Sequence, residues 1–214
     1  RELGCDHRAP FAFTYLEMTR GVAAAAPSFE DPAVLSVLDA RFAQQYFDAV
    51  DNWDAGRLED VPAAWQLALA TADNGQASAA ADLVLGMNAH ISRDLAYTVA
   101  QVVESADDID SETDDYLRIN DVIGSVTDSV LRGAAERFDP NLFLLDQAFA
   151  GEGVPDPVEL IALWRSRSFE LGLQLGTANT VTQRATVEAE IERTAAAGAS
   201  IVVVADTAQR RGAL

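Results

Sequence analysis

Apolar residues recur at intervals of three and four positions along most of the chain, which is the period of an amphipathic helix. The longest stripe runs from Val34 to Trp53, and Asp31-Pro32 before it supplies an N-cap followed by proline. The helices predicted from this pattern cover residues 9–25, 31–54, 61–72, 78–105, 112–138, 140–150, 157–175 and 180–197. The pattern therefore predicts an all-α fold, a single irregular bundle of about seven helices.

Two segments interrupt this pattern. Ile201–Val204 is the only strand-like run, and it is too short to form a sheet alone, so its alanine-rich surroundings favour a helical turn or an extended tail. The GEGVPDP stretch at residues 151–157 is the clearest break, because glycine and proline interrupt helices. We expect one helical domain over residues 1–214, with 151–157 as a loop or a subdomain boundary.

The charge balance narrows the range of partners. The chain has 34 acidic and 15 basic residues, every basic residue is arginine, and the net charge is −19. So acidic a chain should be repelled by nucleic acid and by anionic membranes, and no apolar run approaches the roughly 20 residues of a membrane span. The single cysteine, Cys5, excludes an internal disulfide. The expected partner is a small molecule, and the sequence does not indicate an oligomeric state.

The localisation that we expect is cytoplasmic, because no signal-peptide pattern is visible. The chain begins at Arg1, so removal of an earlier segment stays open.

A row of polar residues lies on the otherwise apolar helix predicted for 78–105. On a helical wheel His90, Asp94 and Tyr97 fall within about 60° of one another. The apolar remainder of the helix indicates burial, and buried polar groups must find partners. Such a row either ties helices together or lines a cavity.

His90 and Asp94 suit two chemistries. Asp94 can orient the imidazole of His90 and make it a general acid or base, or both side chains can ligate a single divalent metal ion. The chain has only two histidines, so a zinc site with three histidines is excluded and further carboxylates, such as Asp121, would be needed. The structural alternative is a satisfied core histidine paired with the aspartate of its own helix.

Three further side chains are candidate neighbours of this pair. Asn88 lies on the same helix, and Asn120 and Asp121 lie on the next one, from which either residue can face His90 across the bundle. The Trp164–Arg167 segment offers cations that could hold a carboxylate or phosphate, although arginines in an acidic protein more often pair with acidic neighbours.

The segment Leu85–Leu95, LGMNAHISRDL, resembles a signature of a family of uncharacterised helical proteins that is common in actinobacteria. Members of that family carry a similar Asn-Ala-His-Ile-Asn-x-Asp-Leu core, and here Ser92 stands where the second asparagine is usual. The likeness covers residues 1–150 and extends to the following positions: Phe11–Leu16, Phe42–Trp53, Val61–Trp65 and Asn120. It implies an all-helical domain and no particular activity.

The His-x-x-x-Asp spacing is also similar to the helical ligand pair of zinc-dependent phospholipase C. That family uses several more histidines than this chain contains, so its trinuclear zinc site is not implied.

These observations lead to one main hypothesis and two alternatives. The main hypothesis is a small-molecule enzyme with an interhelical cavity, in which the pair acts as general acid/base or metal ligand in hydrolysis, cyclisation or isomerisation. The catalytic candidates are His90, Asp94, Asn88, Tyr97, Asn120 and Asp121. The alternatives are a non-catalytic module that binds a small ligand, and a structural helical domain with a buried polar row.

Overall fold

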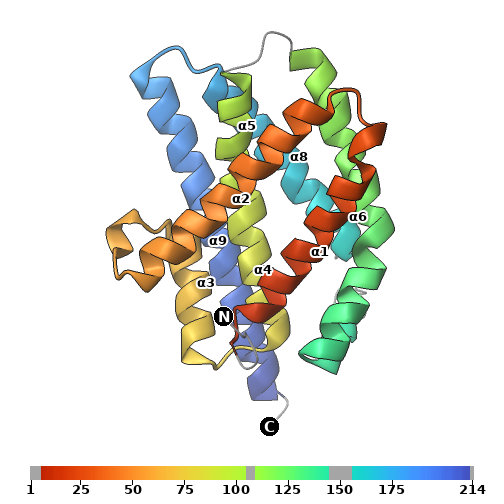
Figure 1. The fold of residues 1–214 in the computed structure, drawn as a ribbon. Helices are drawn as coiled ribbons and strands as arrows, with labels where there is room; N and C mark the ends of the chain where they lie inside the picture. The colour runs from red at the N-terminus through yellow and green to blue at the C-terminus, as the bar shows by residue number, and fades with distance from the viewer. Residues whose placement is uncertain (1–5, 105–108, 145–155, 213–214) are drawn as a thin grey trace.

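The fold consists of long helices joined by short connections (Figure 1). A computed structural model describes residues 6–104, 109–144 and 156–212. The α-helices are α1 (Ala9–Ala25), α2 (Pro32–Asp54), α3 (Ala63–Asn74), α4 (Ala79–Asn88), α5 (Leu95–Val103), α6 (Ile109–Arg137), α8 (Pro157–Gly176) and α9 (Val181–Gly212). The shorter helical turns are η1 (Ala26–Ser28), η2 (Leu58–Asp60), η3 (Ala89–Asp94) and η4 (Pro140–Leu144). No strand occurs in these ranges, so the predicted all-α class is confirmed.

Helices α4 and α5 form one long rod, because η3 joins them without a break. In Figure 1 this rod runs through the middle of the bundle, with α1 and α2 crossing on the near side. Helix α8 packs along α5, α9 packs against α3 and α4, and α6 packs against α1. The rod that carries His90 is therefore enclosed by other helices.

The helix boundaries follow the local signals in the sequence. The Asp31 carboxylate accepts hydrogen bonds from the backbone amides of Ala33 and Val34 and so caps α2. The Asp156 carboxylate caps α8 in the same way, through the amide of Glu159 at 2.8 Å. Gly75 ends α3 in the left-handed conformation, with φ of 61°.

One predicted boundary is wrong. Helix α9 does not end near residue 197 but continues to Gly212, so the strand-like Ile201–Val204 run is helical. The alanine-rich chain before it extends the helix, and β-branched residues tolerate that conformation at a small cost. Ile201 and Val204 are 69% and 68% exposed, so no sheet partner covers them.

Two other boundaries differ in part. Helix α6 starts at Ile109, earlier than the expected residue 112. The helix expected over 140–150 begins with the short turn η4, and its residues 145–150 lie outside the described ranges, as do 151–155 of the expected loop.

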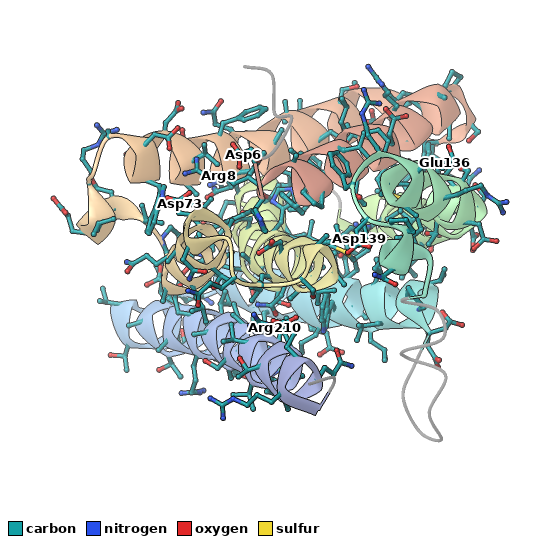
Figure 2. The ribbon with its side chains drawn as sticks, turned by 90° about the horizontal axis from the view of Figure 1, so that it is seen from below. Asp6, Arg8, Asp73, Glu136, Asp139 and Arg210 are labelled. Carbon is teal, nitrogen blue, oxygen red and sulfur yellow. The ribbon has the colours of Figure 1, made fainter. Side chains whose placement is uncertain are left out.

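The start of α1 is fixed by ion pairs, which matters because α1 contributes one wall of the site. Figure 2 labels Asp6, Arg8 and Asp73, which lie close together where α1 meets the end of α3. The Arg8 guanidinium donates to Asp73 at 2.6 Å and to Asp54 at 2.8 Å. The ends of α2 and α3 are thereby tied to the first turn of α1.

Glycines allow α8 to approach α5 closely. A Cβ added at Gly172 would lie 2.6 Å from Cβ of Val99 and 2.8 Å from the carbonyl oxygen of Ala96. Neither atom is the end of a flexible chain, so α8 would have to move away from α5. Gly176 makes the same kind of approach to Val103 one turn later.

We expect Gly172→Ala to lower the free energy of unfolding by about 1–3 kcal/mol, because it overpacks this helix contact. Gly124→Ala is the matched control, since its new Cβ would meet only Cγ1 of Val158 at 3.5 Å and should be neutral or slightly stabilising. Urea unfolding of both variants measures the difference. Equal stability of the two variants would contradict the close packing of α5 on α8.

None of the helices in the described ranges combines the length and the apolar character that crossing a bilayer requires.

Candidate functional site

His90 and Asp94 lie in η3, where the central rod widens into a π-helical turn. The Leu95 amide donates to the His90 carbonyl, five residues earlier, instead of the usual four. The Ile91 carbonyl instead accepts a hydrogen bond from the Ser168 hydroxyl of α8 at 2.6 Å. Short π-helical insertions are common at functional sites because they re-aim side chains.

Asp94 is the centre of a buried hydrogen-bond network, and its side chain is 0% exposed. Oδ2 accepts from the Trp65 indole Nε1 at 2.8 Å and lies 3.1 Å from Nδ1 of His90. Oδ1 accepts from the Arg93 guanidinium at 2.8 Å. A buried carboxylate needs such donors and a compensating cation, and Arg93 supplies the charge.

His90 is held between aromatic rings. Its imidazole stacks on Phe42 with ring centres 3.6 Å apart, and the Tyr15 ring meets its edge at 4.5 Å. Burial lowers the pKa of His90 below its ordinary value, although the hydrogen bond and the charge of Asp94 act in the opposite direction. We therefore take His90 to be neutral at pH 7.

The hydrogen bonds of His90 fix its tautomer. Asp94 is an acceptor, so Nδ1 carries the proton and Nε2 is left with a lone pair. The Nε2 atom is buried and has no hydrogen-bond partner. A buried acceptor without a partner is unfavourable for stability, so its presence points to a ligand or a reaction.

A cavity of about 90 Å³ lies beside this imidazole, between α1, α2, α6, α8 and the central rod. Most of its lining is apolar and includes Met18, Val22, Leu38, Ile119, Ile123 and Ile161. Four of its lining residues carry polar groups that matter below: Thr14, Asp39, His90 and Arg165. An apolar cavity with a few polar groups is the usual form of a small-molecule site.

Two of these polar residues bear opposite charges. Burial raises the pKa of Asp39 to about 6, and the positive charge of Arg165 limits that rise. Arg165 is itself buried and donates to the Asn120 side chain at 2.7 Å. The hydroxyl of Thr14 is buried without a hydrogen-bond partner. The residues that line the cavity therefore carry an imidazole, a carboxyl group, a guanidinium and a hydroxyl.

The structure places Asn88 and Tyr97 away from the cavity. The Asn88 amide donates to the Ala195 carbonyl at 2.8 Å and so joins α4 to α9. The Tyr97 hydroxyl donates to Glu192 of α9 at 3.2 Å. The wheel that aligned Tyr97 with His90 assumed a regular α-helix, and the wider π turn shifts later positions by up to about 100°.

Asn120 and Asp121 are separated by the same helix geometry. Asn120 reaches the site indirectly, through its hydrogen bond to Arg165. Asp121 is exposed on α6 and does not line the cavity. Adjacent positions on a helix point about 100° apart, so at most one of them was able to face His90.

The geometry does not favour joint metal ligation by His90 and Asp94. Nδ1 of His90 and Oδ2 of Asp94 are hydrogen-bonded to each other, and Oδ1 of Asp94 accepts a hydrogen bond from Arg93. Within the described ranges no group of three histidine, cysteine, aspartate or glutamate side chains is placed to hold a metal ion. Acid/base chemistry therefore fits the pair of His90 and Asp94 better than joint metal ligation does.

The sequence reasoning missed Asp39, although a signal for it was present. Asp39 follows Leu35 by four positions and precedes Phe42 by three, so it lies on the apolar face of α2. A carboxylate within an apolar stripe indicates a polar group aimed into the bundle. The hydrogen bond from Trp65 to Asp94 has no comparable signal in the sequence, because the two residues lie on separate helices.

Comparison with known proteins identifies the family but no activity. A search of curated proteins and a search of solved structures found no match. A family model described as a family of unknown function, DUF5995, matches residues 2–205, a longer part of the chain than the expected 1–150. That range includes the central rod, α8 and most of α9, and on this evidence the chain belongs to the DUF5995 family of unknown function.

Proposed function

We propose that this protein is a small-molecule enzyme in which neutral His90 acts as a general base through Nε2. The observation that carries the proposal is the buried Nε2 atom, which lacks a partner while its ring lines the cavity. The large majority of buried side-chain nitrogen and oxygen atoms in proteins have a hydrogen-bond partner. The unpartnered nitrogen therefore supports a ligand site over a purely structural polar row.

The surroundings suit proton transfer. The Asp94 carboxylate holds the tautomer of His90 and would stabilise the imidazolium that forms when Nε2 takes a proton. Arg93 and Trp65 hold Asp94 in place. The proton comes from a water or from a ligand C–H or O–H group, which corresponds to hydrolysis or to isomerisation and cyclisation.

Ester hydrolysis gives a direct test, with methyl acetate as the probe, because a cavity of about 90 Å³ has no room for an aromatic ester. The chain has no lysine, so acyl transfer to lysine adds no background. We expect wild-type turnover to fall roughly 10²–10⁴-fold in His90→Gln, the range that a general base contributes. Because the pKa of His90 is lowered, the rate should be independent of pH from neutral upward and should fall in acid.

His7→Gln is the matched control, since His7 is the other histidine and bonds to Asp82 at the start of α4, outside the cavity. It should keep the wild-type rate. Equal rates for wild type and folded His90→Gln, or no wild-type turnover above buffer, would contradict base catalysis of hydrolysis. A melting curve for each variant shows whether it is folded.

A further inference from the structure

Asp39 and Arg165 form the charged part of the cavity. Both residues line it, from α2 and α8 respectively, and Arg165 is close enough to influence the ionisation of Asp39. Among the described residues no ion pair or hydrogen bond joins them. The two opposite charges therefore share one low-dielectric space without direct contact.

The Arg165 guanidinium is held in position by protein groups. Its Nε donates to Asn120 at 2.7 Å, and its Cζ lies over the Tyr116 ring, 4.5 Å from the ring centre. The Tyr116 hydroxyl in turn donates to the Arg165 backbone carbonyl at 2.7 Å. Such a fixed guanidinium is a donor ready for an oxygen acceptor. Neither Asn120 nor Tyr116 brings a negative charge to it.

The Asp39 carboxyl is the complementary acceptor. It is partly buried, and no hydrogen bond from the described residues satisfies it. A ligand group that donates a hydrogen bond would satisfy the Asp39 carboxyl.

We propose that Asp39 and Arg165 together bind the uncharged polar head of a small apolar ligand, a head that both donates and accepts hydrogen bonds, such as a carboxamide. The carbonyl oxygen would accept from Arg165, and the N–H would donate to Asp39. The apolar remainder would lie among the aliphatic side chains of α1 and α6.

Charge decides between this head group and its alternatives. Asp39 and Arg165 together have no net charge. A carboxylate ligand is attracted by Arg165 but repelled by Asp39, and an ammonium ligand is attracted by Asp39 but repelled by Arg165. A neutral dipolar group satisfies both residues and avoids the burial of an extra charge. The volume of about 90 Å³ favours compact ligands, since an apolar cavity of about 150 Å³ accepts benzene.

This inference rests on the proposed function, because it takes the same cavity as the ligand site. It is tested with three probes of equal carbon length: propionamide, propionate and propylammonium. Titration of each at pH 7.5 is followed by the imidazole NMR signals, which are few because the chain has only two histidines. We expect propionamide to shift the His90 signal and to bind at least about tenfold more tightly than either ion.

The variant Asp39→Asn removes one charge with little change in shape. We expect its preference to move to propionate, with about a tenfold gain in affinity for that ion, because Arg165 is then unopposed. Asp48→Asn is the matched control, since Asp48 is exposed on the same helix. It should keep the wild-type order of affinities.

Three outcomes would overturn the assignment of the head group. They are a wild-type preference for either ion, an Asp39→Asn variant that behaves like Asp48→Asn, and no shift of His90 with any probe. The ester assay on His90→Gln judges the proposed base independently, because its substrate carries neither an amide nor a charged head. Failure of the head-group assignment is therefore distinguishable from failure of the base.

Discussion

Replacement of Asp94 by alanine is expected to lower the free energy of unfolding by about 3–5 kcal/mol, the range found when one partner of a buried ion pair is removed. Asp94 is fully buried and accepts from His90, Trp65 and Arg93. Its loss leaves Glu192 as the carboxylate partner of the Arg93 guanidinium, and it leaves Nδ1 of His90 and Nε1 of Trp65 without an acceptor. Chemical denaturation of the wild type and the variant measures the difference.

Asp94→Asn separates shape from charge. All three neighbours of Asp94 are donors, and an amide nitrogen is unable to accept from any of them. We therefore expect Asp94→Asn to lose about 2–4 kcal/mol despite its similar volume. Asp121→Asn is the control, because Asp121 is exposed, and it should lie within about 0.5 kcal/mol of wild type. An Asp94→Asn variant as stable as Asp121→Asn would contradict the network.

Replacement of Trp65 by alanine is expected to destabilise the fold by about 3–5 kcal/mol, because it empties a core position that is 1% exposed. Trp65→Phe keeps a smaller aromatic ring and removes the hydrogen bond from Nε1 to Asp94, so a smaller loss of about 1.5–3 kcal/mol is expected. Thermal or chemical unfolding distinguishes the two losses.

Trp53→Phe is the matched control for the indole bond. The Trp53 indole also donates to a carboxylate at 2.8 Å, that of Asp73, but at the surface of the protein. Loss of this exposed hydrogen bond should lower the free energy of unfolding by at most about 1 kcal/mol, because water replaces it. Equal effects of the two Trp→Phe changes would show that burial of Asp94 does not strengthen its hydrogen bonds.

The sequence predicts the helices well, because their signals are local. The apolar stripe of α2 and the caps Asp31 and Asp156 are visible without knowledge of the fold. The end of α9 was misplaced because the β-branched run Ile201–Val204 suggested a change of conformation that the preceding helix overrides. Boundaries of this kind depend on context more than on the residues themselves.

The site was predictable only in part. The contact between His90 and Asp94 follows from their spacing on one helix. The π turn has no such signature, and it displaced Tyr97 from the expected row. The cavity joins α1, α2, α6 and α8, so the meeting of Asp39 with Arg165 depends on helix packing that a single sequence does not reveal.

The pH dependence of stability should reflect the neutral state of His90. Its pKa in the folded protein lies below the unfolded value of about 6.5, so the unfolded chain binds the extra proton first. The contribution of His90 to the free energy of unfolding is therefore fully present above about pH 6.5 and is lost as the pH falls toward the pKa of His90 in the folded protein. Asp39, whose pKa is raised to about 6, acts in the opposite sense between about pH 4 and 6.

The protonation state of His90 is the most direct test of the account. Long-range ¹H–¹⁵N spectra of histidine-labelled protein between pH 5 and 8 report the tautomer of each of the two imidazoles, and His7→Gln assigns them. The account predicts that His90 stays neutral down to a pH below 6.5, with the proton on Nδ1 and Nε2 bare. A proton on Nε2, or titration of His90 near its ordinary pKa, would contradict the proposed base.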